Sequence, residues 1–411
     1  MTINTTRLDS GLTVVTERMP DVRSVAVGFW VGTGSRDEDP HVAGASHFLE
    51  HLLFKGTDLR SARDIAEAVD EVGGDSNAFT TKEYTAFYIR VLSDAQDMAI
   101  DLLSDIMWAP AFRAEDVEAE REVIREEISM HADEPADLVH ELLSAALFPA
   151  HSLGRDVLGD ATTISAMERD EIAAFHSHHY RPANIILAAA GDLDHDKIVA
   201  AIERTFTGAT GGVQPKRVPP AEPDGRRAVI TRPGEQAHLV LGVPALDRDH
   251  DDRYALAVLN HIVGGGMSSR LFQEIRERRG LAYSVYSYRS SYEGAGTLAI
   301  YVGTSPSKAR DVLGLIEAEL DRLVDHGITG RELTMAKSHL LGSLALSLED
   351  SGARMSRLGR SQLVHGRVPP VDELERRLQG VTIADVNRVI GEVLAGPRVV
   401  AGVGPFGEED L

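Results

Sequence analysis

A stretch crowded with glycine, proline and threonine divides this chain into two parts of similar length. Residues 207–226 (TGATGGVQPKRVPPAEPDGR) keep no hydrophobic period, so they predict a linker rather than a helix or a strand. At 411 residues the chain also exceeds what one hydrophobic core usually serves. We therefore expect two domains, 1–206 and 227–411, joined by this linker.

The two parts show the same order of strand-like and helix-like segments. Each begins with an apolar strand-like run (24–31 and 238–243), followed by an apolar helix (43–54 and 253–263) and a second helix (62–71 and 269–278). Strands at 84–91 and 297–303 each precede a further helix (94–107 and 307–324), and each part ends with a helix and an apolar strand (185–190 and 399–403). This order predicts an α+β fold made of two homologous α/β-sandwich domains, each a mixed sheet with helices, that arose by internal duplication.

The first part contains the segment His47-Phe48-Leu49-Glu50-His51, which reads H-x-x-E-H. On a helix, His47 and His51 lie four residues apart and share one face, where two imidazoles can bind one zinc ion. Glu50 lies on the same side, within reach of a water at that zinc. Two nitrogen ligands beside a free carboxylate are typical of metal-assisted amide hydrolysis.

A third ligand is needed, and the helix predicted at 114–131 supplies acids for it. Glu120 and Glu127 are two turns apart on nearly the same stripe of this helix, which also holds two apolar residues, Val123 and Ile124. A carboxylate on an inward stripe is costly unless it is paired or bound to a metal. We therefore predict Glu127 as the third ligand and Glu120 as a carboxylate that holds a histidine or the ligand helix.

The spacing of these residues resembles that of the inverted-motif zinc metallopeptidases, which include pitrilysin, insulin-degrading enzyme and mitochondrial processing peptidase. The resemblance is nearest to the processing-peptidase β-subunit type and covers essentially the whole chain. It is carried by HFLEHLLFKGT at 47–57, EREVIREE at 120–127, GGDSNAFT at 73–80 with Glu83 and Thr85, LGRDVLG at 153–159, YRPAN at 180–184, RLF at 270–272 and RERRGLAY at 276–283.

The resemblance implies two related domains in a half-shell and one zinc ion per chain. It implies that Glu50 is the catalytic acid–base, Tyr283 a donor to the oxyanion and Arg276 a clamp on the substrate backbone. It also implies that Asn77, Ala78 and Phe79 form an exposed edge strand to which an extended peptide substrate adds. Larger relatives close a chamber with four such domains, so the resemblance implies a homodimer whose active site is completed in trans.

Asp137 and Glu141 are four residues apart, on the helix expected after the ligand helix. At matching positions, mitochondrial processing peptidase uses an acidic pair to recognise an arginine just before the scissile bond. The resemblance therefore extends to a preference for arginine near the cleavage site. The simpler interpretation of such a pair is an ordinary solvated helix face.

Composition excludes several other kinds of protein. The net charge of −22 argues against nucleic-acid binding, because phosphates would be repelled. With no cysteine, zinc is not bound by thiolates and disulfides are absent. No apolar run is long enough to span a membrane, and the first residues lack the features of a signal or transit peptide. We expect a cytoplasmic protein that does not bind membranes.

Three other motifs suggest sites but have simpler explanations. His176, His178 and His179 end a helix, where charged imidazolium groups would suit the helix dipole. The glycines at 264–266 fit a tight turn between helices better than a phosphate loop. His261, at the place corresponding to the zinc motif, has no second histidine beside it and is expected to be a core or surface residue.

The leading function is thus a zinc endopeptidase acting on unfolded or extended peptides. Two alternatives stay open. One is a non-catalytic structural subunit, although relatives of that kind have usually lost zinc-motif residues that are present here. The other is an active subunit that needs a different, inactive partner chain.

Overall fold

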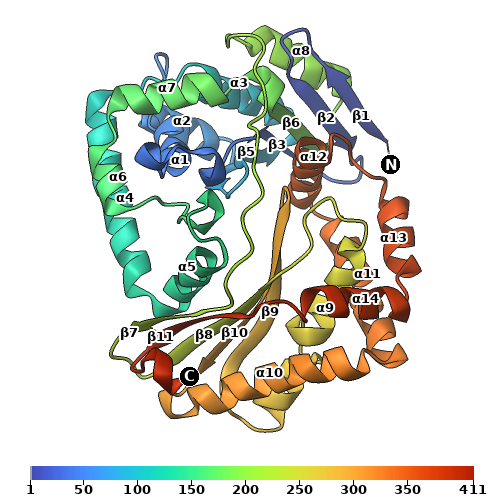
Figure 1. Ribbon diagram of the computed structural model, residues 1–411. Coiled ribbons are helices and arrows are strands. Elements are labelled where there is room, and N and C mark those ends of the chain that lie inside the picture. The colour runs from blue at the N-terminus through green and yellow to red at the C-terminus, as the bar shows by residue number, and fades with distance from the viewer. Residues whose placement is uncertain (1) are drawn as a thin grey trace. The chain divides into compact units, whose positions relative to one another are not determined.

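The computed structural model describes residues 2–411 (Figure 1). They form two compact units. Unit 1 contains the residues up to Ile128, together with Asp156–Lys216 and Leu344–Pro369, and unit 2 contains Ser129–Arg155, Arg217–Ser343 and Pro370–Leu411. The chain passes from one unit to the other between residues 216 and 217, within the linker that the sequence predicts. Two segments, however, are exchanged between the halves. Residues 129–155, from the first half of the sequence, belong to unit 2, and residues 344–369, from the second half, belong to unit 1.

The sheet of unit 1 has six strands in the order β1-β2-β6-β3-β5-β4. These strands are β1 (Ile3–Arg7), β2 (Thr13–Arg18), β3 (Ser24–Val31), β4 (Asp75–Thr80), β5 (Thr85–Leu92) and β6 (Ile185–Gly191). β2 and β6 pair in parallel, and the other neighbours are antiparallel. Among residues 2–411, β4 pairs only with β5, so it is an edge strand, as the sequence predicts.

The sheet of unit 2 repeats this arrangement with five strands in the order β7-β11-β8-β10-β9. They are β7 (Arg227–Thr231), β8 (Ala237–Pro244), β9 (Ala282–Tyr292), β10 (Ala295–Thr304) and β11 (Val399–Gly404). β7 and β11 are parallel and the other pairs are antiparallel. The order and the directions of these five strands match those of β2-β6-β3-β5-β4 in unit 1. The predicted duplication of one α/β unit is therefore confirmed.

Helices cover both sheets. In unit 1 they are α1 (Ala45–Leu53), α2 (Ala62–Asp70), α3 (Gln96–Trp108), most of α4 (Ala114–Asp133), α6 (Ala161–Ala166), α7 (Arg169–His179), α8 (His195–Thr205) and α12 (Ser351–His365). In unit 2 they are α5 (Pro135–Leu147), α9 (Arg253–Gly264), the π-helix Phe272–Glu277, α10 (Ala309–His326), most of α11 (Gly330–Ser347), α13 (Val371–Gly380) and α14 (Ile383–Val393). None of the helices in residues 2–411 combines the length and apolar character needed to cross a lipid bilayer.

The central strands of unit 1 are buried on both faces, which explains why β3 is a continuous apolar run. On one face, Val27 and Phe29 pack in the main core with helices such as α1 and α3. On the other face, Trp30 packs against α12, where its Nε1–H points to the sulfur of Met355 at 3.4 Å. Helix α12, from the second half of the sequence, therefore covers one face of the sheet of unit 1 (Figure 1).

The corresponding exchange occurs in unit 2. Helix α5, from the first half of the sequence, packs against β8 and β11 through an apolar face that includes Val139, Leu143 and Leu147. The opposite face of the same sheet packs against α9, α10 and α14 in a separate core. Each sheet is thus covered on one face by helices of its own half and on the other by a helix of the other half.

Candidate metal centre

Helix α1 carries the H-x-x-E-H motif, and its start is fixed by two features. Gly44, which precedes the helix, has φ of +96°, a conformation that L side chains avoid. The buried carboxylate of Glu38 accepts hydrogen bonds from the backbone N–H groups of Gly44 (2.8 Å) and Ser46 (2.7 Å). These bonds satisfy N–H groups at the helix start, where a negative charge is also favoured. Together they hold the first turn of α1 in place.

The two histidines of α1 lie one above the other, as their spacing predicts. The ring centroids of His47 and His51 are 4.7 Å apart. His47 is buried and His51 is half-buried, so the pair lies between the core and the surface. Both side chains therefore present ring nitrogens to the same point.

Glu127 on α4 reaches the same point. Its Oε2 atom lies 3.6 Å from Nε2 of His47 and 3.6 Å from Nε2 of His51. Two ligands of a tetrahedral zinc ion, each about 2.05 Å from the metal, would lie about 3.3 Å apart. The three donor atoms thus nearly form one face of a zinc coordination shell, and two imidazoles with one carboxylate are a donor set that catalytic zinc sites use. No other trio of potential ligands gathers in this way anywhere in residues 2–411.

Glu120, two turns before Glu127 on α4, is buried and fully paired. Its Oε2 accepts a hydrogen bond from Nδ1 of His51 at 3.0 Å, and its Oε1 lies 2.7 Å from the ammonium group of Lys55. Because a carboxylate offers only acceptors, the proton of His51 lies on Nδ1 and leaves Nε2 free to bind a metal. This geometry is consistent with the predicted role of Glu120 in holding a histidine. The contact with Lys55 was not predicted from the sequence.

The carboxylate of Glu50 lies beside the same cluster. Its Oε2 accepts a hydrogen bond of 2.6 Å from the hydroxyl of Thr80, the last residue of β4. Burial raises the pKa of Glu50 above its ordinary value, while hydrogen bonds from Thr80 and the nearby His51 work in the opposite direction. Glu50 is therefore held between the helix of the motif and the edge strand.

One detail of the α4 prediction is wrong. Ile124 is buried, but Val123 is 49% exposed and does not share the inward stripe with Glu120 and Glu127. The difference arises because only a narrow face of α4 packs on the unit. Arg121 of this helix stacks on Phe48 of α1 and donates to the carbonyl of Ile164, which holds α4 against α1 and α6.

The residues predicted to bind a peptide lie along β4. Asn77 is exposed, whereas Ala78 and Phe79 are half-buried. Ala78 packs on the main core and Phe79 on the opposite face, against Trp30 and Tyr84. The N–H of Ala78 donates to the side-chain oxygen of Asn77 at 2.8 Å. The strand is thus firmly packed on both faces and open at its edge.

Arg276 and Tyr283 lie together in unit 2. Nη1 of Arg276 donates to the backbone carbonyl of Tyr283 at 2.8 Å, and its guanidinium lies 4.7 Å from the Tyr283 ring centroid and 4.8 Å from that of Phe272. Tyr283 is 83% exposed. The helix predicted at 269–278 adopts a π-helix at Phe272–Glu277, and this element carries Arg276.

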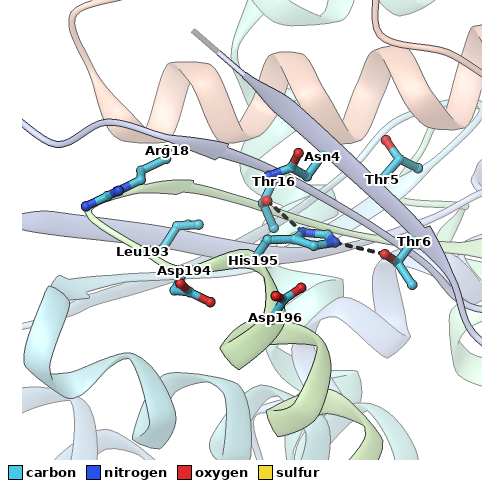
Figure 2. Close-up of a pocket in the computed structure, with 9 residues that line it drawn as sticks. All are labelled: Asn4, Thr5, Thr6, Thr16, Arg18, Leu193, Asp194, His195 and Asp196. Carbon is cyan, nitrogen blue, oxygen red and sulfur yellow. Dashed lines mark hydrogen bonds between the residues drawn. The ribbon is translucent and has the colours of Figure 1, made fainter.

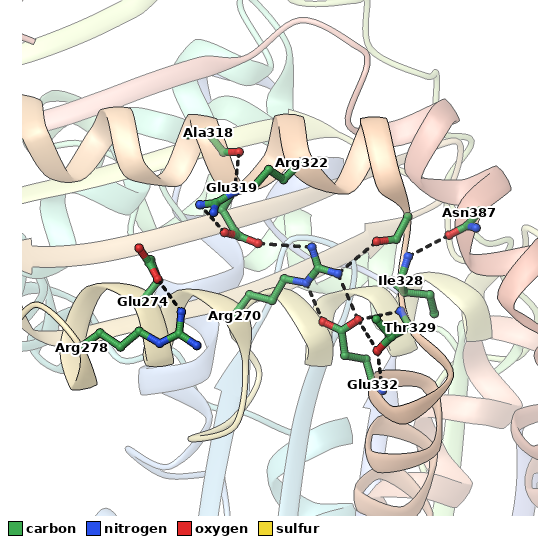
Figure 3. Close-up of polar contacts among 11 residues, drawn as sticks. Arg270, Glu274, Arg278, Ala318, Glu319, Arg322, Ile328, Thr329, Glu332 and Asn387 are labelled. Atoms are coloured by element: carbon green, nitrogen blue, oxygen red, sulfur yellow. Dashed lines mark hydrogen bonds and ion pairs between the residues drawn. The ribbon is translucent and has the colours of Figure 1, made fainter.

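Arg270 fixes the start of that helical segment (Figure 3). Its guanidinium pairs with Glu332 (2.6 Å) and Glu319 (3.2 Å) and donates to the carbonyl of Gly327 (3.0 Å). These partners lie on α10, on α11 and in the turn between them. Arg270 therefore has a structural role, and it anchors the segment from which Arg276 extends.

Asp137 and Glu141 both lie on α5, the helix after the ligand helix, as predicted. This helix belongs to unit 2, however, whereas the sequence placed it in the first domain. Asp137 is exposed in the first turn and Glu141 is half-buried. Between them, His140 contacts two tyrosine hydroxyls, with Nδ1 2.6 Å from Tyr288 and Nε2 3.3 Å from Tyr286. Burial lowers the pKa of His140, and the charge of Asp137 partly offsets this. No residue pattern indicated this aromatic group, because its members lie far apart along the chain.

The charged interpretation of the histidines at the end of α7 is wrong for two of them. His176 is half-buried beside Phe112 and contacts the carbonyl of Met107 (3.1 Å), and desolvation lowers its pKa to about 4. The pKa of His179 is also lowered to about 4, by burial and by His178. Both rings are neutral at pH 7. In unit 2, the buried His261 stacks on His339 at 4.2 Å, which places it at the edge of the core.

A polar hollow in unit 1 contains one further histidine (Figure 2). His195, the first residue of α8, lies between the hydroxyls of Thr6 (2.8 Å to Nε2) and Thr16 (2.9 Å to Nδ1). Both ring nitrogens are therefore used to join α8 to β1 and β2. We assign His195 a structural role.

Comparisons with known proteins show the family to which the chain belongs. Residues 13–161 match the insulinase family, peptidase family M16, and residues 166–340 match the peptidase M16 inactive domain. An uncharacterized zinc protease of Streptomyces coelicolor is 46% identical over 413 residues, covering 98% of this chain and 90% of that protein. An uncharacterized zinc protease of Bacillus subtilis is 41% identical over 400 residues and covers 97% of each chain.

Two solved structures share the fold. A peptidase M16 inactive domain from Pseudomonas fluorescens has a TM-score of 0.92 at 24% identity, covering 99% of both chains. A protease from Helicobacter pylori has a TM-score of 0.93 at 24% identity, covering 98% of this chain and 99% of that one. A duplicated α/β fold with a two-histidine, one-glutamate cluster in its first copy defines the class of inverted-motif zinc peptidases. The chain belongs to peptidase family M16, and the family resemblance found in the sequence is confirmed.

Proposed function

We propose that this protein is a zinc-dependent endopeptidase that hydrolyses peptide bonds in unfolded or extended peptides. The observation that carries the proposal is the convergence of His47, His51 and Glu127 on one point, with Glu50 beside them. These side chains would hold one zinc ion per chain. When bound, zinc acts as a Lewis acid towards the substrate carbonyl and lowers the pKa of water.

The remaining chemistry belongs to the chain's own residues. Glu50 accepts a proton from the attacking water and passes it to the leaving amine, which is the role of a general acid–base group. Burial raises the pKa of Glu50, which makes its carboxylate a stronger proton acceptor. Glu120 keeps His51 in the tautomer that presents Nε2.

Substrate binding is proposed to use the open edge of β4. An extended peptide adds to such an edge through main-chain hydrogen bonds, which demand little of its sequence. Asn77, Ala78 and Phe79 lie on this strand and would contact the peptide. This mode favours unfolded chains, because a folded protein seldom offers a free extended segment.

The residues of unit 2 complete the proposal. We assign Tyr283 as a donor to the oxyanion and Arg276 as a clamp on the substrate backbone, since the two form a pre-assembled pair with an exposed ring. Asp137 and Glu141 would favour arginine near the cleavage site. We further propose a cytoplasmic homodimer in which one chain supplies Arg276 and Tyr283 to the site of the other, without nucleic-acid or membrane partners.

The decisive experiment measures zinc content and cleavage of a set of fluorogenic peptides for wild type and Glu50→Gln. We expect about one zinc per chain in both proteins and cleavage by wild type alone. Zinc without cleavage of any peptide by wild type would favour the non-catalytic subunit. Cleavage that appears only after a different family member is added would favour the heterodimer.

A further inference from the structure

Thr80 links the edge strand of unit 1 to the carboxylate of Glu50. Its hydroxyl donates to Oε2 of Glu50 at 2.6 Å, and its backbone hydrogen-bonds the same carboxylate. A bond of this kind, from a hydroxyl to an ionised acceptor, is among the stronger ones in proteins. It connects two elements that are otherwise separate, since Glu50 lies on α1 and Thr80 ends β4.

The position of Thr80 is fixed by the turn that follows it. Thr80 pairs with Thr85 across the hairpin, and the N–H of Thr81 closes the turn on the carbonyl of Tyr84 at 2.8 Å. A buried ion pair of 2.6 Å between Glu83 and Arg36 ties the same turn to the segment before α1. The turn directly after β4 is therefore tied to the segment before α1.

The segment that holds this turn also holds α1. The N–H of Ser35 donates to the carbonyl of Thr81 at 3.2 Å, and a Cβ at Gly34 would lie only 2.2 Å from that oxygen. A few residues later, Glu38 caps the start of α1. One short segment thus sets the positions of both partners, and the bond between Thr80 and Glu50 is pre-organised.

We propose that Thr80 is a positioning residue that couples the docking of a peptide on β4 to the orientation of Glu50. The inference rests on the proposed endopeptidase function. The hydrogen bond from Thr80 to Oε2 sets the orientation in which the Glu50 carboxylate accepts the proton of water. A peptide that pairs along β4 restrains the strand up to Thr80, and so restrains the carboxylate in its working orientation.

Another threonine of the same hairpin provides a matched control. Thr85 lies directly opposite Thr80, is buried, and donates to the backbone carbonyl of Thr33 at 3.0 Å instead of to Glu50. Replacing either residue by valine keeps the shape and the strand propensity and removes one hydroxyl. Only the change at Thr80 removes a hydrogen bond to the Glu50 side chain.

The test compares wild type, Thr80→Val, Thr80→Ser and Thr85→Val for zinc content and for kcat and KM on a long and a short peptide. In Thr80→Val we expect full zinc content, KM within about twofold, and kcat on the long peptide reduced roughly tenfold, because the backbone contact remains. Thr80→Ser restores kcat, and Thr85→Val lowers Tm while keeping kcat. The advantage in kcat of the long peptide over the short one shrinks in Thr80→Val only.

Structures of the zinc-loaded variants give a second readout that does not depend on turnover. We expect the Glu50 carboxylate in more than one orientation in Thr80→Val and in a single one in Thr80→Ser. An unchanged kcat in Thr80→Val, an equal loss in Thr80→Ser, or an unchanged advantage of the long peptide each overturns the inference while leaving the peptidase function standing. An inactive wild type overturns both.

Discussion

Nδ1 of His51 lies 3.0 Å from Oε2 of Glu120, a carboxylate that is buried and also paired with Lys55. The contact fixes which nitrogen of His51 faces the point shared with His47 and Glu127. Groups that orient a metal ligand in this way typically change metal affinity by 10- to 100-fold when they are removed. The supporting carboxylate is therefore as much a part of the centre as the ligands.

We predict that Glu120→Gln weakens zinc binding by roughly 10- to 100-fold without abolishing it, because the amide lacks the charge that stabilises the histidine. Competition with a chromophoric chelator measures the affinity. Glu122→Gln is the control, since Glu122 lies on the same helix but is exposed and pairs with Arg125. Equal zinc affinity in the Glu120→Gln and Glu122→Gln variants would show that His51 needs no such partner.

Adjacent glutamates on α4 distinguish the ligand from its neighbour. Glu127→Gln and His51→Ala should each lose zinc, because a site with two remaining ligands binds the ion weakly. Glu126→Gln should keep it, since Glu126 is exposed while Glu127 has an oxygen 3.6 Å from both histidines. Metal analysis after gel filtration decides between them, and loss of zinc from Glu126→Gln alone would make the ligand assignment wrong.

The desolvated ring of His176 makes stability depend on pH. Its pKa is about 4 in the folded chain and about 6.5 when unfolded, so below pH 6.5 the unfolded chain binds a proton that the folded chain does not. Stability is unaffected above that pH and falls as the pH drops from 6.5 to 4, by about 3 kcal/mol in total for this group. Urea unfolding across this pH range should show a smaller decrease in the free energy of unfolding for His176→Gln than for wild type. Parallel curves for the two proteins would mean that His176 takes up its proton in the folded state.

Peptides with arginine near the scissile bond should be cut faster than their alanine analogues, by roughly tenfold in kcat/KM. The advantage should disappear in Asp137→Asn/Glu141→Gln, while cleavage of the alanine peptides is preserved. It should also shrink as salt is added, because Asp137 is exposed to solvent. A double variant that loses the same factor on both kinds of peptide would show that these acids support the fold of α5 and not specificity.

Local spacing was enough to predict that three candidate metal ligands lie close together. His47, His51 and Glu127 lie on two helices whose faces follow from residue periodicity, and the duplication follows from the order of segments. The contact of Thr80 with Glu50 was not predictable, because it joins residues 30 positions apart across a strand and a helix. The exchange of α5 and α12 was missed for a related reason, since an amphipathic helix shows which face is buried but not which sheet covers it.

Burial of single side chains was harder to predict than the elements themselves. Val123 is apolar yet exposed, and His176 is polar yet half-buried and neutral. In both cases the deciding contacts come from residues distant in sequence, such as Phe112 for His176. Periodicity places a residue on a helix, and only the packed structure determines what lies opposite it.

Assembly can be tested with two inactive variants. Arg276 and Tyr283 belong to unit 2, whereas His47, His51 and Glu127, the predicted metal ligands, belong to unit 1. If two copies associate about a two-fold axis, each site can receive Arg276 of the partner subunit. The arginine and the zinc ligands of one site then come from different chains. Glu50→Gln then disables the site of its own chain, while Arg276→Ala disables the site of its partner.

Mixing Glu50→Gln with Arg276→Ala, and allowing subunits to exchange, should therefore restore activity. In a mixed dimer the Arg276→Ala chain keeps Glu50 and takes its arginine from the other chain, so one site of the two is complete. Because about half of the dimers are mixed after random exchange, recovery should approach roughly a quarter of the wild-type rate. Native mass spectrometry measures the exchange. Complete exchange without any recovery would show that Arg276 acts on the zinc site of its own chain, or on neither.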